Sequence, residues 1–412
     1  MKRRVVVTGL GVVSSIGIGK EEFWKNLTAG RSGIGEVARF DTKRYKRHFG
    51  GDIKDFSPED FIHKKSVRYV GRATQLGIAG VKLALEDAKI NPAEMDERKK
   101  TCIILGTTMP EDDLIDHCTG NLVSRKTKNI SKNDILNLFP HSLIHNISHF
   151  LKIKCNGLLI PNACGAGNFA IGYAFDLISK GAYDLGIVGG TESFSRIAFQ
   201  GFQAMRAMAE QKCSPFDKNR QGMLLGEGSG ILILEEYGNA LKRNAPIYGE
   251  VLGYGQSCDA RSMTIPQKEG VFKSMKKALD NSGVSADKVD YISAHGTATI
   301  ANDKNESAAI KELFGSRYNN IPVSSIKSML GHTMGAASAI EAAVCCLAIE
   351  RGVIPPTINY ETQDPDCGID CVPGVSRKYN VDVALNNGFA FGGNNCCVVF
   401  KKPGPAVLNG LT

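Results

Sequence analysis

Short runs of β-branched residues alternate with longer amphipathic stretches along the whole chain. Strands separated by helical segments are typical of parallel or mixed sheets covered by helices, so the sequence predicts an α/β protein. Strands are expected at residues 4–8, 101–105, 185–188, 230–234, 291–293, 381–385 and 397–400. Helices are expected at residues 20–28, 68–88, 168–180, 270–282 and 336–350.

The size and charge of the chain limit what it can be. With 412 residues, of which 42% are hydrophobic, it can bury a large core, and we expect two linked domains or one duplicated fold. Fifty Lys and Arg against 42 Asp and Glu give a net charge of +8. This charge is too mild and scattered for a nucleic-acid partner, although an acidic protein can dock locally.

The twelve cysteines are dispersed, and the chain contains no Cys-x-x-Cys pair. This spacing predicts no metal site and a reduced, cytoplasmic protein whose thiols are mostly buried. The basic start is followed by an apolar run that Gly9 and Gly11 interrupt, which argues against a signal peptide. No apolar stretch approaches the length of a membrane span, so we expect no membrane association.

Two stretches of the chain share one pattern. Residues 161–167 and 322–332 each lead from a strand through a glycine-containing turn into a helix, and a further strand follows each helix. The pattern predicts an internal repeat that displays side chains at two strand-to-helix turns.

Cys164 is the candidate nucleophile in the first of these turns. We expect it in the first turn of the helix at 168–180, where the helix dipole and free amides favour the thiolate. The small residues Gly165, Ala166 and Gly167 would let a substrate approach closely. The alternative is a buried structural cysteine.

Two histidines follow turns in the second part of the chain. His295 comes directly after a strand, which places it at the sheet edge where α/β proteins bind ligands, and Thr297 and Thr299 are suited to bind an amide-containing arm. His332 precedes a helix of small residues. Neutral imidazoles at both positions can donate hydrogen bonds to an oxyanion or a departing carboxylate. The alternative for each is a turn histidine with a purely structural partner.

Two further segments carry candidate residues. A buried Lys327 would need a carboxylate, and we expect an ion pair with Glu306, with an exposed lysine as the alternative. Phe391, flanked by glycines, is suited to gate a pocket, and its amide can complete an oxyanion hole with that of Cys164. A tight turn with a core phenylalanine is the alternative there. The glycines at 9 and 11 partly mimic a dinucleotide motif, but the third glycine is missing and no such cofactor is expected.

Four motifs stand in a characteristic order: Asn162-Ala-Cys-Gly-Ala-Gly, His295-Gly-Thr-Ala-Thr with Asp303-Lys-Asn-Glu, Lys327-Ser-Met-Leu-Gly-His and Gly388-Phe-Ala-Phe-Gly-Gly. Together they closely resemble the β-ketoacyl-acyl carrier protein synthases of the type I and II group, within the thiolase superfamily. The resemblance covers nearly the whole chain, including residues 214–217 and 225–230.

The resemblance implies a duplicated, five-layered αβαβα fold with mixed sheets, divided into halves at 1–250 and 251–412. It also implies a decarboxylative condensation. An acyl chain moves from the phosphopantetheine of a carrier protein to Cys164, and the carbanion from malonyl-carrier attacks the thioester. His295 and His332 assist decarboxylation, Lys327 pairs with Glu306, Thr297 and Thr299 hold the pantetheine, and Phe391 gates the pocket. No cofactor beyond carrier-bound phosphopantetheine is implied.

The chain departs from the family pattern at Ile300, Asn302 and Asn394, where the family usually has proline, glycine and threonine. At 106–113 a segment with Met109 and Pro110 replaces a glycine-rich apolar one beside the acyl pocket. Met109 is therefore expected to reshape the acyl channel or subunit contact, which favours a specialised chain over ordinary fatty acids.

Several functions and partners stay open at this point. The synthase can serve fatty acid or type II polyketide synthesis, as a homodimer or as a heterodimer with a ketosynthase-like subunit, including one for specialised polyketides or aryl polyenes. A non-catalytic channel-shaping subunit and a nicotinamide oxidoreductase are the alternatives, and the retained Cys164 argues against the former. We expect the acidic carrier protein to dock on a basic cluster, with a merely solvated face as the alternative. The cluster comprises Lys64, Lys65, Arg68 and Arg72.

Overall fold

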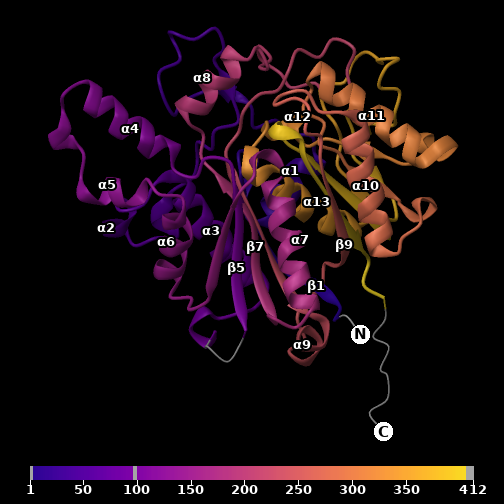
Figure 1. The fold of residues 1–412 in the computed structure, drawn as a ribbon, viewed down its shortest axis with the longest axis horizontal. Coiled ribbons are helices and arrows are strands. Elements are labelled where there is room, and N and C mark those ends of the chain that lie inside the picture. Colours follow the sequence, from indigo (N-terminus) through magenta and orange to yellow (C-terminus); the bar gives the residue numbers. More distant parts are fainter. Residues whose placement is uncertain (1–2, 96–99, 405–412) are drawn as a thin grey trace.

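The computed structural model describes residues 3–95 and 100–404 (Figure 1). Its strands are β1 Val5–Ser14, β2 Gly17–Ile18, β3 Gly35–Glu36, β4 Phe49–Gly50, β5 Thr101–Thr107, β6 Asn156–Pro161, β7 Leu185–Glu192, β8 Gly228–Glu236, β9 Gly249–Cys258, β10 Tyr291–Ser293, β11 Val323–Ser324, β12 Val353–Ile354, β13 Arg377–Lys378, β14 Val383–Phe389 and β15 Asn394–Lys401. Its α-helices are α1 Lys20–Thr28, α2 Lys64–Val67, α3 Arg72–Asp87, α4 Asp112–Val123, α5 Lys132–Asn137, α6 His141–Leu151, α7 Ala166–Ser179, α8 Arg196–Ala204, α9 Tyr237–Lys242, α10 Lys268–Ser282, α11 Ile300–Phe314, α12 Lys327–Leu330 and α13 Ala337–Arg351.

The main sheet consists of two sets of strands with the same internal order. The first set runs β1-β8-β7-β5-β6 and the second runs β9-β15-β14-β10-β11. In each set the first two pairings are antiparallel and the last two are parallel. The two sets meet where β1 pairs antiparallel with β9. Matching order and direction show a duplicated unit, as expected. The division at residue 250 itself stays a prediction.

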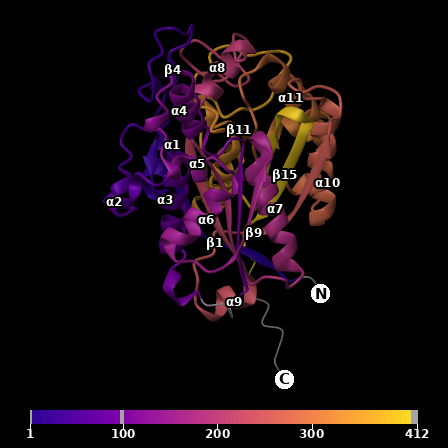
Figure 2. The same cartoon turned by 60° about the vertical axis from the view of Figure 1, so that its left-hand side comes forward.

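Helices complete five layers around these two sets. α7 and α13 pack against each other and against strands of both sets, α3 covers the outer side of the first set, and α10 covers the outer side of the second. Figure 2 shows the two sets diverging around the central helices. This is the predicted αβαβα arrangement.

The central helices approach each other closely. Residues 337–349 of α13 are all buried, as expected for a helix enclosed on every side. A Cβ at Gly167 would lie 2.7 Å from the backbone nitrogen of Ala339. Gly167 therefore permits the close contact between α7 and α13. The expectation that it lets a substrate approach is wrong.

Each strand and helix expected from the sequence has a counterpart, and α1 and β10 have the expected ends. The helix expected from residue 68 begins instead at Arg72, because residues 68–71 form the turn between α2 and α3. β6 agrees with the strand expected before residue 161, whereas α4, α5, α6, α8, α11 and β9 were not expected from the sequence.

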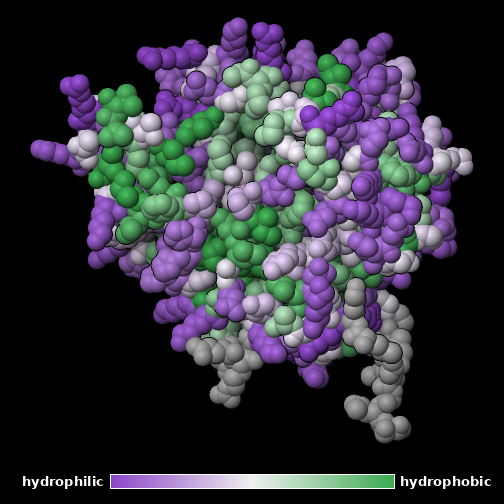
Figure 3. All heavy atoms as spheres, in the orientation of Figure 1, coloured by the Kyte–Doolittle hydropathy of each residue, from purple (hydrophilic) through white to green (hydrophobic). Residues whose placement is uncertain are grey.

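The outer surface contains exposed apolar side chains over α4 and α5, which project from one side of the molecule (Figure 3). They include Leu122, Val123, Leu136 and Phe139. Within the described ranges, no helix combines the length and apolar character needed to cross a bilayer.

Candidate active site

Three turns at one end of the two strand sets bring Cys164, His295 and His332 together. The Cys164 sulfur and one nitrogen from each imidazole lie within 4.8 Å of one another. The two imidazole rings meet edge to face, with centroids 5.4 Å apart, and all three side chains are buried. The convergence expected from the motifs is therefore a feature of the structure, although the catalytic roles of the three residues remain predictions.

The turns that hold Cys164 and His332 share an unusual backbone. Ala163, directly before the cysteine, has φ 43°, and Met334, two residues after the histidine, has φ 46°. Each residue begins a 3₁₀ turn, Ala163–Gly165 or Met334–Ala336, that leads into α7 or α13. Residues other than glycine occupy this left-handed region only when the surrounding structure enforces it. The packed central helices provide that enforcement in both halves.

The sulfur of Cys164 is not a resting thiolate. Burial raises the pKa of the Cys164 thiol to about 11, although Lys327 and the amides of Phe391 and Cys164 act in the opposite direction. The expectation that the helix start makes a thiolate at neutral pH is therefore wrong, because desolvation outweighs the helix amides. The amide of Phe391 nevertheless lies at the sulfur, where the expected oxyanion hole requires it.

Both imidazoles are held in the neutral form. Burial lowers the pKa of His295 and of His332 well below 6.5, and the nearby Lys327 ammonium lowers both further. The backbone N–H of Met334 donates to Nδ1 of His332 at 3.1 Å, so the neutral ring carries its proton on Nε2. Nε2 of His332 has no hydrogen-bond partner among the described residues, and neither has Nδ1 of His295.

One cysteine and two histidines at this spacing also resemble a metal ligand set. A metal-bound imidazole usually donates its other N–H to a neighbour, whereas Nδ1 of His332 accepts a hydrogen bond. The Lys327 charge acts on both rings as well and would repel a cation. The donor set fits hydrogen-bond and proton-transfer chemistry better than metal binding.

The predicted ion pair between Lys327 and Glu306 is wrong. Lys327, 1% exposed, pairs with the equally buried Glu341 of α13. Glu306 instead accepts hydrogen bonds from the amides of His295 and Gly296, both at 2.8 Å. Glu306 thus holds the turn that carries His295, while Glu341 neutralises the lysine. The signal for Glu341 was its isolation as a single acidic residue in the apolar run 337–349.

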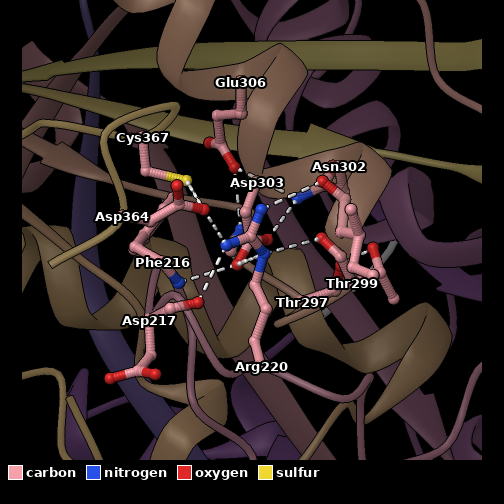
Figure 4. A network of polar contacts seen from close by, with 12 residues as sticks. Phe216, Asp217, Arg220, Thr297, Thr299, Asn302, Asp303, Glu306, Asp364 and Cys367 are labelled. Atoms are coloured by element: carbon pink, nitrogen blue, oxygen red, sulfur yellow. Dashed lines mark hydrogen bonds and ion pairs between the residues drawn. The ribbon is translucent and has the colours of Figure 1, made fainter. Parts of the chain in front are cut away.

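The turn with Thr297 and Thr299 is fixed by a residue that the sequence analysis missed. The two threonine hydroxyls lie 2.9 Å apart. Figure 4 shows the Arg220 guanidinium beside this turn, where it donates to the carbonyls of Thr299 and Ile300. It also pairs with Asp303 and with Asp364. Arg220 follows the motif at 214–217 by three residues, and that proximity was the available signal.

A cavity of about 410 Å³ adjoins the three central residues. Its lining includes Cys164, His295, Thr297, Thr299, His332 and Phe391. Phe391 stacks on Phe202 with ring centroids 5.6 Å apart, and the following Gly392 and Gly393 have positive φ, which glycine adopts without strain. Met109 lies outside this lining and packs in the same apolar cluster as Phe391.

The expected basic cluster is only partly available at the surface. Lys64, Lys65 and Arg68 are exposed. Arg72 is 6% exposed and forms an ion pair with Glu227 at 2.7 Å. The inclusion of Arg72 in a docking face is therefore wrong, because the new helix that begins there turns its side chain into the core.

Comparison with known proteins agrees with this geometry. The family models described as the N-terminal and C-terminal domains of β-ketoacyl synthase match residues 2–240 and 248–361. The chain is 40% identical to a 3-oxoacyl-acyl-carrier-protein synthase 2 of Synechocystis sp., over 97% of this chain and 98% of that protein. A protein of the same name from Staphylococcus aureus is 36% identical, with the same coverage.

Solved structures give the same result. The ishigamide ketosynthase/chain length factor superposes with a TM-score of 0.94 at 41% identity, covering 98% of this chain and 100% of that one. A type II polyketide ketosynthase in complex with its acyl-carrier protein gives a TM-score of 0.89 at 31% identity, with the same coverage. From the order of its motifs, the duplicated fold and these matches, the chain belongs to the β-ketoacyl synthase family.

Proposed function

We propose that this protein is a β-ketoacyl-acyl carrier protein synthase that joins a Cys164-bound acyl chain to malonyl-carrier with loss of CO2. The observation that carries the proposal is a buried thiol within 4.8 Å of two neutral imidazoles at the wall of one cavity. A channel-shaping subunit without catalysis has no use for this arrangement.

In the first step the acyl group moves from the carrier's phosphopantetheine to Cys164. Because the thiol is protonated, its proton must leave as the sulfur attacks the thioester carbonyl. His295 has an unpartnered Nδ1, whereas the free nitrogen of His332 already carries hydrogen, so His295 is the proton acceptor. The amides of Cys164 and Phe391 stabilise the oxyanion, and the departing phosphopantetheine thiolate takes up the proton.

In the second step malonyl-carrier occupies the cavity and loses its carboxylate as CO2. The electron pair of the broken C–C bond forms a thioester enolate, whose oxygen accepts the Nε2 hydrogen of His332. The α-carbon then attacks the acyl thioester on Cys164. A C–C bond forms and the C–S bond breaks, which releases β-ketoacyl-carrier and the Cys164 thiolate. The thiolate then takes up a proton from water and returns to the resting thiol.

The edge of the first strand set is the surface that best suits a second subunit. β6 ends the sheet, so one side of it has no strand neighbour in the described part of the chain. Leu158 of β6 and Tyr173 of α7 are exposed beside that edge. Unpaired strand edges with apolar neighbours favour association. We infer a dimer through β6, with either a second copy or a ketosynthase-like partner.

The dimer also bears on carrier docking. Figures 1 and 2 place α2 on the opposite side of the subunit from α11, whose residues 300–302 line the cavity. A carrier protein that binds Lys64, Lys65 and Arg68 of one subunit is therefore better placed to deliver its substrate to the other. All twelve cysteines are free thiols, and we place the reaction in the reducing cytoplasm.

Mass spectrometry of the protein after incubation with acyl-carrier tests the proposal. We expect an acyl adduct on Cys164, release of CO2 and β-ketoacyl-carrier when malonyl-carrier is added, and blockage by cerulenin. A Cys164→Ala variant should form no adduct, and Cys155→Ala, at a thiol far from the cavity lining, should behave as the native protein. Native protein that never becomes acylated would favour the non-catalytic subunit. The mass of the adduct also distinguishes a fatty acid chain from a polyketide chain.

A further inference from the structure

Glu192 is a buried acid at the end of β7 and lies outside the lining of the cavity. Its Oε1 accepts hydrogen bonds from the hydroxyl of Thr107 at 3.1 Å and the amide of Met109 at 3.0 Å. Its Oε2 accepts from the amides of Thr108 at 2.6 Å and Gly335 at 2.9 Å. The side chain is fully buried. Burial raises the pKa of the Glu192 carboxyl, whereas the hydrogen bonds from these four donors lower it. The ionised carboxylate is the form best suited to accept all four.

These bonds connect the turn that follows His332 with the segment at residues 107–109, and the two lie directly against each other: a Cβ at Gly335 would lie 2.4 Å from the Cα of Thr107. Gly335 is the neighbour of Met334, whose amide holds Nδ1 of His332. The two successive amides therefore bind the imidazole and the Glu192 carboxylate from the same strained turn. The other three donors belong to residues 107–109, next to the apolar cluster that contains Phe391.

We propose that Glu192 is a positioning residue that orients His332 for decarboxylation and ties this orientation to the 107–109 segment. The proposal rests on the proposed function and names no new contact with substrate. Without the carboxylate, the turn at Met334 loses its anchor, and the Nε2 hydrogen of His332 is no longer directed at the enolate oxygen.

The charge of Glu192 has a second, opposite effect at Cys164. Its field raises the pKa of the thiol, in addition to the larger effect of burial. Loss of the charge should therefore slow decarboxylation, because His332 loses its orientation. The Cys164 sulfur should stay as reactive as in the native protein or become more reactive, because the thiol pKa is no longer raised by Glu192. A residue that only stabilised the fold would impair both half-reactions together, which makes the split between them diagnostic.

The test is the Glu192→Gln variant, which keeps the size of the side chain. In either orientation of the glutamine side chain, its NH2 group replaces one of the two carboxylate oxygens. Because NH2 cannot accept the hydrogen bonds that this oxygen accepted, two of the four are lost. We expect malonyl-carrier decarboxylation to fall at least about tenfold at a KM within about twofold of native. The rate of Cys164 alkylation by iodoacetamide at pH 8 should be unchanged or higher.

Glu111→Gln is the matched control. Glu111 is an equally buried acid nearby, and its Oε1 accepts only from Thr74. Burial raises the pKa of Glu111 well above 4.5, so glutamine resembles its protonated form. This variant should keep native decarboxylation.

Two outcomes would overturn the inference: decarboxylation by Glu192→Gln within twofold of native, or an equal fall in decarboxylation and alkylation. If that variant does not fold, Thr107→Val, which removes one of the four donors, takes its place. It should lower the decarboxylation rate by a smaller factor and leave Cys164 alkylation unchanged, and an unchanged decarboxylation rate would overturn the inference. A native protein that does not decarboxylate malonyl-carrier would instead refute the proposed function.

Discussion

Lys327 of α12 and Glu341 of α13 form an ion pair sealed from solvent beside the two active-site imidazoles. The lysine lowers the pKa of both rings, while the glutamate provides the opposite charge that lets a lysine remain buried. The pair therefore reinforces the neutral state that burial gives both imidazoles, although neither of its members belongs to the turns that carry Cys164, His295 and His332.

We expect Lys327→Ala to lower the free energy of unfolding by about 3 kcal/mol or more, because it leaves the Glu341 carboxylate buried without a partner. Urea unfolding followed by fluorescence measures this change. The double variant Lys327→Met with Glu341→Leu should recover most of the stability but not the condensation rate. Equal stability of the single variant and the native protein would contradict a buried pair.

The Cys164 thiol predicts a steep alkaline dependence of alkylation. Its pKa is raised to about 11, so the thiolate fraction grows about tenfold for each pH unit between 7 and 9. Inactivation by iodoacetamide should follow that slope without a plateau, with Cys164→Ala as the unlabelled control in peptide mapping. A plateau between pH 7 and 8 would indicate a thiolate that the burial does not permit.

The two imidazoles predict how the protein responds to acid. Their folded-state pKa values lie well below the unfolded value of about 6.5, so the unfolded chain binds more protons as pH falls below 6.5. Stability that is present above pH 6.5 should therefore decline below it, while the native protein keeps both rings neutral and keeps kcat at pH 6. A Tm series and a kcat profile between pH 5 and 8 measure the two effects. Loss of kcat with a midpoint near 6.5 would show an imidazole that titrates normally.

Charge reversal separates the exposed basic residues from the buried one. Lys65→Glu with Arg68→Glu should raise the KM for acyl-carrier several-fold at low salt and leave the Tm unchanged, since both side chains are in solvent. Arg72→Ala should instead lower the Tm, because Glu227 loses its partner. Carrier kinetics that are unaffected by the double reversal at every salt concentration would argue against docking at α2.

Local sequence was enough to single out the three residues that the structure brings together, but not what surrounds them. Cys164, His295 and His332 each stand in a short glycine-containing turn after a strand, so their display depends on neighbours within a few residues. The partner of Lys327 lies on another helix, and the burial of Arg72 depends on Glu227, which directly precedes β8 and is distant along the chain. Spacing along the chain therefore gave the wrong answer for both. Helices α4 and α5 were missed because their exposed apolar residues blur the amphipathic pattern.

The equal strand order of the two sets means that the site is shared between two copies of one unit that are synthesised one after the other. The sulfur is supplied by the copy that leaves the ribosome first, whereas both imidazoles and the amide of Phe391 are supplied by the later one. A partly synthesised chain thus has a harmless thiol. The amide of Phe391, which lies just before β15, is the last of these groups to be synthesised, so a chain that ends before it has the thiol without all of its partners.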